Sequence, residues 1–320
     1  MQLDLLDRKI LTQLDINSRA PFTEIGKKVG ASKETVKYRI DKLVSTRVIT
    51  GFYTAFNTAK LNHFYYKLLI KLHNVTPDLE QEILNYIKNQ KYCAYLGSCS
   101  GSYDLAVLLM LKTPHQFHKF IADLKRNYGE HIIEKDMHFP LSITRFNMRL
   151  YDGCEKTITI YKQDDKPIQK IDKTDLDILN LLSTNSRIPL IEIGKKLNLD
   201  PKVIQYRIKK LEKEGIILRY VVAVDYSKLE FKFTQIDIIL KDLDCVPEIT
   251  EFFNRTNRCI HSIEMLGKYD LTIEIFVESD ELQRKIIGEF RDKFIGRYLS
   301  YDILDMYKEH LIIWGPFYWD

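Results

Sequence analysis

The sequence predicts an α+β fold that contains two helix-turn-helix units and two ferredoxin-like (βαββαβ) units in tandem. Three observations predict it. Moving the chain by 168 residues places 6–61 on 174–229 without a gap, and 22 of the 56 aligned positions are identical. Each copy begins with three short helical patterns. Each copy then continues with strands and helices in the order β-α-β-β-α-β, which is the ferredoxin-like plan.

The first two helices of each copy carry apolar residues with the period of an amphipathic helix. Thr174 and Asp177 have the spacing of a capping box, which predicts the start of the first helix in the second copy. Gly30 and Asn198 follow the second helix, and both residue types favour the left-handed conformation that ends a helix. We therefore expect the second helix to stop there in both copies.

The third helix follows after a very short turn. Ser32 and Asp200 occupy equivalent positions in the two copies and are residue types typical of an N-cap. Apolar residues then recur every three to four positions, which predicts one buried face. Two helices joined by so tight a turn indicate a helix-turn-helix.

The remaining elements follow each third helix. In the first copy we expect them at 48–56, 65–72, 79–88, a strand pair around Gly101, 116–125 and 132–139. In the second copy we expect them at 216–224, 234–240, 248–254, 259–266, 270–277, 282–293 and 301–307, with a short strand between the copies at 157–161. The predicted domains are 1–57 and 173–226 for the helical units, 62–148 and 230–310 for the ferredoxin-like units, 149–172 for a linker and 311–320 for an aromatic tail.

Composition argues against several classes of protein. The five Cys are odd in number and form no CxxC pair, so they predict neither a disulfide framework nor a zinc finger and fit a reducing cytoplasm. The longest uncharged apolar run, Leu105–Leu111, is far shorter than the ~20 residues that span a bilayer. We expect a cytoplasmic protein without a membrane partner. No glycine-rich phosphate loop, metal-ligand set or catalytic triad is recognisable, so no cofactor, metal or catalytic residue is predicted.

Positive charge is concentrated in the two helical units. Residues 1–57 hold 10 Lys or Arg against 6 Asp or Glu, and residues 170–229 hold 12 against 8, so each unit carries +4. The remainder of the chain balances to −4. A helix that can enter the major groove, together with basic residues that neutralise phosphates, meets the geometric and electrostatic requirements of duplex binding. The predicted partner is double-stranded DNA.

The third helix of each copy supplies the predicted DNA contacts. Base readout is expected near its N-terminus, where the copies differ, and phosphate contact is expected where they match. The residues are Lys33, Thr35, Lys37, Tyr38, Arg39 and Lys42 in the first copy, and Lys202, Val203, Gln205, Tyr206, Arg207, Lys209 and Lys210 in the second.

A structural alternative exists for some of these side chains. Arg39 and Arg207 could instead pair with carboxylates of the first helix, such as Asp7 or Asp175. Tyr38 and Tyr206 could instead pack on their own module. The exposed lysines could simply solvate a helix face. These roles remain open at the level of sequence.

Each copy resembles the Lrp/AsnC, or feast/famine, family of prokaryotic transcription regulators. The resemblance is carried by NSRAPFTEIGKKVGASKETVKYRIDKL in the first copy, by NSRIPLIEIGKKLNLDPKVIQYRIKKLEKEGII in the second, and by GxYDL in both. It covers nearly all of the chain outside the linker and the last residues. It implies a winged helix-turn-helix joined to a ferredoxin-like RAM domain that mediates self-association and often senses amino acids.

The resemblance also implies an effector-linked turn in each RAM domain. The matching residues are Gly101, Tyr103 and Asp104 in the first copy, and Gly267, Tyr269 and Asp270 in the second. The alternative is structural, because a glycine between two strands can simply supply the positive φ of a hairpin. With two units on one chain, a single polypeptide could provide both halves of the family's dimer and recognise an imperfect palindrome.

Two other functions are alternatives for this sequence. Sirohaem decarboxylases resemble this family in architecture and carry a His-rich stretch, broadly HNYxRxHxYN. His261 matches its first position, but Met265, Gly267 and Asp270 replace the Arg, the second His and the Asn. Copy one has Tyr95, Cys99 and Gly101 at the first-His, Arg and second-His places. A RAM-type binding or assembly protein without DNA affinity is the other alternative. We predict a regulator and not an enzyme.

Overall fold

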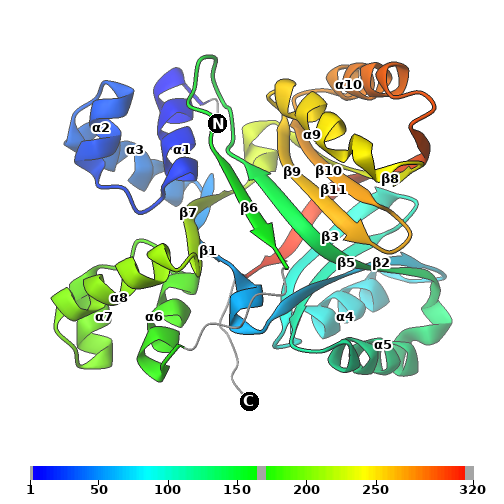
Figure 1. Ribbon diagram of the computed structural model, residues 1–320, viewed down its shortest axis with the longest axis horizontal. Coiled ribbons are helices and arrows are strands. Elements are labelled where there is room, and N and C mark those ends of the chain that lie inside the picture. The colour runs from blue at the N-terminus through cyan, green and yellow to red at the C-terminus, as the bar shows by residue number, and fades with distance from the viewer. Residues whose placement is uncertain (1–2, 164–170, 314–320) are drawn as a thin grey trace.

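The computed structural model describes residues 3–163 and 171–313 of the chain. Two small helical modules lie next to each other along one side, and a large sheet with its own helices forms the other side (Figure 1). This arrangement confirms the predicted α+β class with two winged helix-turn-helix units and two ferredoxin-like units.

We call the helical modules the first head and the second head. The first head consists of α1 (Leu5–Ile16), α2 (Phe22–Val29), α3 (Lys33–Ser45) and the wing strand β1 (Ile49–Phe56). The second head consists of α6 (Lys173–Thr184), α7 (Leu190–Leu197), α8 (Pro201–Lys213) and the wing strand β7 (Ile217–Val224).

The predicted helix boundaries in the heads are mostly confirmed by their caps. Ser32 accepts a hydrogen bond from the Thr35 amide at 3.1 Å and begins α3, and Asp200 begins α8 in the same way. Gly30 and Asn198 end α2 and α7 in the left-handed conformation, with φ of 74° and 54°. The capping box predicted at Thr174 was wrong. The N-cap of α6 is Asp172, because its carboxylate accepts a hydrogen bond from the Asp175 amide.

The two heads are joined through their wings. Strands β1 and β7 pair antiparallel, and α1 packs on β7 while α6 packs on β1, so each head rests on the wing of the other copy. At the centre, the hydroxyl oxygens of Ser18 and Ser186 lie 2.6 Å apart. Arg19 donates to the carbonyl of Ile188 at 3.2 Å, and Arg187 reciprocates to Ala20 at 3.2 Å. The repeated NSR segments, residues 17–19 and 185–187, therefore hold the heads together.

The ferredoxin-like units, called RAM units below, repeat one order of elements. The first contains η1 (Thr58–Leu61), β2 (Phe64–Leu72), α4 (Pro77–Lys88), β3 (Cys93–Gly101), β4 (Leu105–Leu111), α5 (Pro114–Tyr128), η2 (Gly129–His131) and β5 (Ile132–Phe146). The second contains η3 (Tyr226–Leu229), β8 (Lys232–Leu240), η4 (Leu243–Cys245), α9 (Val246–Arg255), β9 (Cys259–Leu266), β10 (Leu271–Val277), α10 (Asp280–Lys293) and β11 (Tyr298–Ile312).

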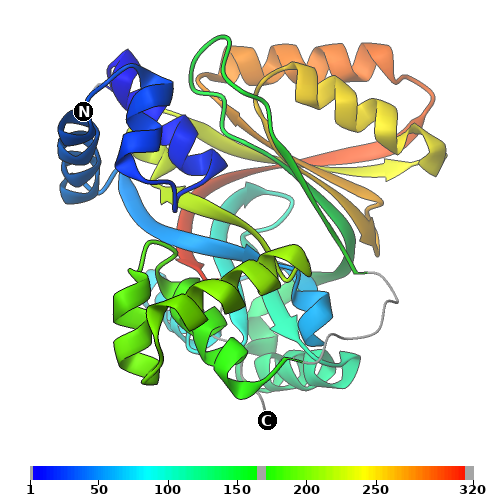
Figure 2. The same cartoon turned by 60° about the vertical axis from the view of Figure 1, so that its left-hand side comes forward.

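The two RAM sheets close on each other. Along the sheet the strands run β2-β4-β3-β11-β8-β10-β9-β5, and β5 also pairs with β2, so eight antiparallel strands form a closed ring. Helices α4 and α5 cover one side of the ring, and α9 and α10 cover the opposite side (Figure 2). Closure leaves neither RAM unit with an unpaired inner edge.

The last strand of each RAM unit is longer than predicted. β5 and β11 each contain 15 residues. The first part of β5 pairs with β2 of its own unit, and the second part pairs with β9 of the other unit. β11 pairs with β8 and then with β3 in the same manner. The extra length exists because a second partner strand is available only in the folded chain.

The predicted linker is partly ordered into the fold. Its short strand is β6 (Ile158–Lys162), which adds to the free edge of β5. Met148 and Leu150 pack into the core of the first head. Residues 314–320 of the predicted aromatic tail lie outside the described residues. In the part of the chain that the structure describes, every helix is too short or too polar to cross a bilayer.

Gly101 lies where the ring closes, and its conformation leads to a prediction about stability. This residue has a φ of +128°, and a Cβ there would collide with the carbonyl oxygen of Ile303 on β11. We expect Gly101→Ala to lower the free energy of unfolding by about 2–3 kcal/mol, measured by urea denaturation. Gly288, in the middle of α10, has open space at its Cβ and is the matched control. Gly288→Ala should be neutral or stabilising by about 0.5–1 kcal/mol, and equal losses in both variants would contradict the assignment.

Candidate nucleic-acid interface

The predicted base-reading side chains lie on the open face of α3 and α8. Val36, Ile40 and Leu43 face the core of the first head, and their equivalents do so in the second. The opposite face is exposed and polar. The predicted contacts that are exposed are Lys33, Lys37, Tyr38 and Lys42 in the first head, and Lys202, Val203, Gln205, Tyr206, Lys209 and Lys210 in the second; the acids Glu34 and Asp41 of α3 are exposed as well. Thr35 is half-buried and is the one predicted reader of α3 that bonds within its own cap.

The two tyrosines are the most exposed aromatic residues of the heads. Tyr38 keeps 65% of its surface accessible and Tyr206 keeps 69%, so neither packs on its own module. The alternative of intramodular packing is therefore wrong for both. An exposed ring with a hydroxyl on the same face as several lysines can donate to a phosphate oxygen.

Arg39 and Arg207 follow the structural alternative. The Arg39 guanidinium lies 2.6 Å from the carboxylate of Asp4 and 3.2 Å from that of Asp7. Arg207 lies 2.7 Å from both Asp172 and Asp175. Asp4 and Asp172 are also the N-caps of α1 and α6, so each arginine ties the start of the first helix to the third. Their predicted role as phosphate contacts requires these bonds to be shared or exchanged.

Four further basic residues, which were not predicted from the sequence, flank α3 and α8. Lys27 and Lys28 are exposed in the last turn of α2, and Lys195 and Lys196 are exposed in the last turn of α7. They come from the repeated word EIGKK, whose lysines could have been included on that ground. Gly26 precedes them at a point where a Cβ would lie 2.5 Å from the Ala31 carbonyl oxygen, which explains why a glycine occupies the turn.

The predicted effector residues are brought together where the RAM units meet. Tyr103 and Tyr269 are both fully buried, at 0% and 1% exposure. Tyr103 donates to Glu134 at 3.2 Å and also to Asp136, and Tyr269 donates to Asp302. Burial and the bond to Asp136 raise the pKa of Tyr103 to about 12, so its hydroxyl stays a donor. These bonds tie each turn to a long strand.

The remaining predicted effector residues have structural contacts as well. The carboxylate of Asp104 accepts from the Leu72 amide at 2.7 Å, and that of Asp270 accepts from the Leu240 amide at 2.8 Å. Gly101 approaches β11, and a Cβ on Gly267 would lie 2.7 Å from the Met137 carbonyl oxygen on β5. Effector contact at these positions stays a prediction.

Lys268 distinguishes the two turns and was missed from the sequence. Its ammonium lies 3.0 Å from Asp136 and 2.9 Å from the Tyr103 hydroxyl, above the rings of both buried tyrosines. The first copy has Ser102 at the equivalent place, bonded to Asp302 at 2.9 Å. The contact between the RAM units is therefore chemically asymmetric.

Helix-turn-helix domains of known families match the sequence of both heads. The AsnC-type helix-turn-helix domain matches residues 3–44, and the winged helix-turn-helix DNA-binding domain matches residues 171–217. The HTH-type transcriptional regulator Ptr1 of Methanocaldococcus jannaschii is 34% identical over 121 residues, which cover 38% of this chain and 80% of Ptr1. The chain belongs to the Lrp/AsnC family of helix-turn-helix regulators. LrpB of Bacillus subtilis is 28% identical over 141 residues, covering 44% of this chain and 93% of LrpB.

Some solved structures match this Lrp/AsnC chain over nearly its whole length. The siroheme decarboxylase NirDL has a TM-score of 0.65 at 12% identity and covers 96% of this chain and 93% of its own. At this identity the likeness concerns the fold alone. It shows that the arrangement of two heads and a shared RAM sheet occurs in another protein.

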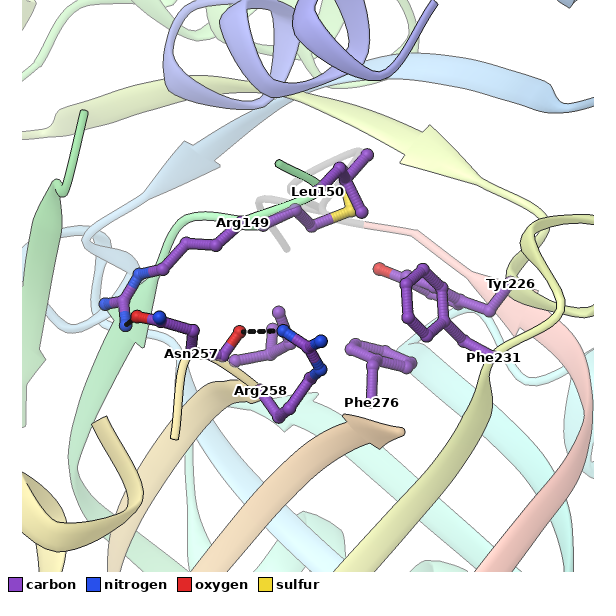
Figure 3. Close-up of a pocket in the computed structure, with 9 residues that line it drawn as sticks. Arg149, Leu150, Tyr226, Phe231, Asn257, Arg258 and Phe276 are labelled. Atoms are coloured by element: carbon purple, nitrogen blue, oxygen red, sulfur yellow. Dashed lines mark hydrogen bonds between the residues drawn. The ribbon is translucent and has the colours of Figure 1, made fainter. Parts of the chain in front are cut away.

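A small pocket lies beside the first head. Figure 3 shows Arg149 reaching toward Asn257, whose side-chain oxygen accepts its hydrogen bond at 3.1 Å, while Tyr226, Phe231 and Phe276 form the far wall. The pocket measures about 20 Å³, which is room for about one water molecule. It cannot hold an organic effector.

Proposed function

We propose that the chain is a sequence-specific DNA-binding transcription regulator of the Lrp/AsnC type. The observation that carries the proposal is the exposed basic face of α3, repeated on α8, with the two heads held on one side of a shared sheet. Lysines on such a face can neutralise phosphates while the helix N-terminus meets base edges. The proposed partner, promoter DNA, also implies that the chain acts in the cytoplasm.

The proposal includes two complete units on one chain that act as a pseudo-dimer. We propose for this pseudo-dimer the domain limits that the sequence predicts. Its support is the pairing of β1 with β7, the closed ring of the RAM strands, and the fact that Ptr1 and LrpB each match less than half of this chain. Further self-association through the RAM units is part of the proposal. The residues expected to read bases differ between the heads. They are Lys33, Thr35 and Lys37 on α3, and Lys202, Val203 and Gln205 on α8, so the preferred site should be an imperfect palindrome.

The site preference is tested by selecting binding sequences from random DNA. We expect two related half-sites that differ at the bases read by the helix N-termini. Recovery of perfect two-fold palindromes would contradict unequal reading by the two heads.

A small effector, such as an amino acid, belongs to the proposal. The contact around Tyr103, Tyr269 and Lys268 supports it, because a ligand bound there would touch both RAM units at once. An effector is supported if its addition changes DNA affinity in the wild type and loses that effect in Lys268→Ser, which copies the residue type of the first turn.

DNA binding itself is tested by titrating the full chain with its own promoter region at several salt concentrations. A specific complex whose affinity falls steeply with salt supports the regulator. Absence of binding together with a spectral change on addition of sirohaem would favour an enzyme like NirDL. Absence of both would favour a RAM-type binding or assembly protein.

A further inference from the structure

A second and larger cavity lies between the wing strands and the ring of RAM strands. It measures about 220 Å³ and is lined by residues of β1 and β7 on one side and of the RAM sheets on the other. An apolar protein cavity of about 150 Å³ already admits benzene, so this volume fits a ligand with one ring. Among the described residues, eight aromatic side chains line it, including Tyr53 of β1, Tyr95 of β3, and Phe276 of β10.

The cationic groups of the lining already have partners. Arg145 and Arg219 both point to Asp15, and the nearer pair is 2.7 Å apart. Lys67 donates to the side-chain oxygen of Gln235 at 2.8 Å. Arg145 and Arg219 thus share one buried carboxylate, whereas the partner of Lys67 is a neutral amide oxygen.

The lining holds two acidic groups, and they differ in their partners. Glu274 lies 2.7 Å from the imidazole of His261. Glu309, on β11, lies in the same lining beside Tyr95, and its close charged neighbours among the described residues are the acids Glu274 and Asp225. A carboxylate enclosed in this way without a cation is unfavourable unless it is protonated or gains a positive partner.

The pKa of Glu309 leads to a separate prediction, about how the stability of the chain changes with pH. Burial and the neighbouring Glu274 raise this pKa from 4.5 to about 7. The folded chain thus holds the proton more tightly than the unfolded chain, so the contribution of Glu309 to stability falls as the pH rises from 4.5 to about 7. We expect Glu309→Gln to raise the Tm above that of the wild type at about pH 8 and to leave it nearly unchanged at about pH 5. An equal difference at both values would contradict this.

We propose that the cavity binds a small organic cation, an amine on an apolar body of about one ring, whose ammonium group meets Glu309 and Glu274. Carboxylates supply the charge that the ligand needs, and the faces of the aromatic side chains attract a cation and pack on an apolar body. The ligand in turn supplies the positive partner that Glu309 lacks.

The position of the cavity connects this ligand to the heads. Tyr53 and Arg219 belong to the wing strands, and Arg219 with Arg145 holds Asp15 near the end of α1. A ligand bound between the wing strands and the ring would contact both of them. This step rests on the proposed function, and it predicts that the amine changes the affinity of the chain for DNA.

The test is a calorimetric titration of the full chain at about pH 8 with 2-phenylethylamine, and with 2-phenylethanol and 3-phenylpropionate as neutral and anionic analogues. We expect saturable binding of the amine with a Kd of about 1 mM or tighter, and binding of both analogues at least about ten times weaker. Glu309→Gln should weaken amine binding at least about tenfold. Glu264→Gln is the control, because Glu264 lies on β9 but is exposed and outside the lining.

Three results would overturn the inference. They are no binding of the amine up to about 10 mM, equal binding by wild type and Glu309→Gln, and tighter binding of the anionic analogue. DNA binding is measured on the same samples. A chain that binds DNA but not the amine refutes only this inference, whereas a chain that binds the amine but not DNA refutes the proposed function.

Discussion

Replacement of four lysines on the recognition helices, Lys37, Lys42, Lys209 and Lys210, by Ala is expected to weaken promoter binding roughly 1000-fold at about 0.1 M salt. All four are exposed on the open faces of α3 and α8. Each phosphate contact releases about one counterion, so the slope of log K against log salt should also fall by about one unit for each lysine removed. Fluorescence anisotropy at several salt concentrations measures both quantities.

The control must remove the same charge from another surface. Lys88, Lys119, Lys125 and Arg126 are exposed on α4 and α5, on the outer side of the first RAM unit. Their replacement by Ala should leave the affinity and the salt slope within about twofold and half a unit of the wild type. If both quadruple variants lose affinity equally, binding depends on net charge alone and the heads are not the specific interface.

Asp15→Ala is expected to lower the free energy of unfolding by about 3–5 kcal/mol. The Asp15 carboxylate is fully buried, lies 2.7 Å from Arg145, and accepts the Met148 amide at 2.7 Å. Burial opposes its ionisation, but the guanidiniums of Arg145 and Arg219 keep the pKa of Asp15 below its ordinary 3.8. Removing the carboxylate leaves two buried cations without their common partner. Thermal denaturation should show a Tm lower by at least about 5 °C.

An exposed ion pair provides the comparison for Asp15. Asp123 lies 2.8 Å from Arg126 on α5, and the arginine is largely exposed. Asp123→Ala should cost no more than about 1 kcal/mol. A Tm of Asp15→Ala equal to that of Asp123→Ala would mean that Arg145 and Arg219 find other acceptors when Asp15 is absent.

The asymmetry of the two copies has a consequence for how the heads are attached. The residue equivalent to Asp15 in the second copy is Ser183, which donates to the Asn180 carbonyl inside its own helix. Asp15 therefore ties the first head by an ion pair to β5 and to the wing strand β7, and Ser183 gives the second head no equivalent pair. The two heads share one sequence pattern but are anchored by different chemistry.

The periodicity of apolar residues and the capping residue types predict the local structure of the heads. Ser32 and Gly30 define the start and stop of helices through bonds to residues only a few positions away. Such contacts are present in any conformation that forms the helix, so the residue types alone indicate them. The exposed lysines of α3 and α8 follow from the same periodicity, because residues that face the core fix which residues face away.

Contacts between distant segments follow less directly from the sequence. Arg39 has two predicted roles, a phosphate contact and an ion pair with Asp7; it lies 3.2 Å from Asp7 and also 2.6 Å from Asp4, 35 positions away, and its phosphate contact stays a prediction. The strand β5 is predicted to stop at 139, yet it continues because β9 of the other copy lies beside it. The pattern of β5 itself does not identify this second partner.

By itself, the sequence determined the duplication, the order of helices and strands in each copy, and the basic third helices, since these depend on composition, period and neighbours within a few residues. Only the tertiary structure decided how the copies join. The closed ring of eight strands, the exchange of wings between heads, and the enclosure of Glu309 and Glu274 in one cavity all depend on contacts between segments far apart in the chain. Such contacts form only when the whole chain has folded, and so no local pattern encodes them.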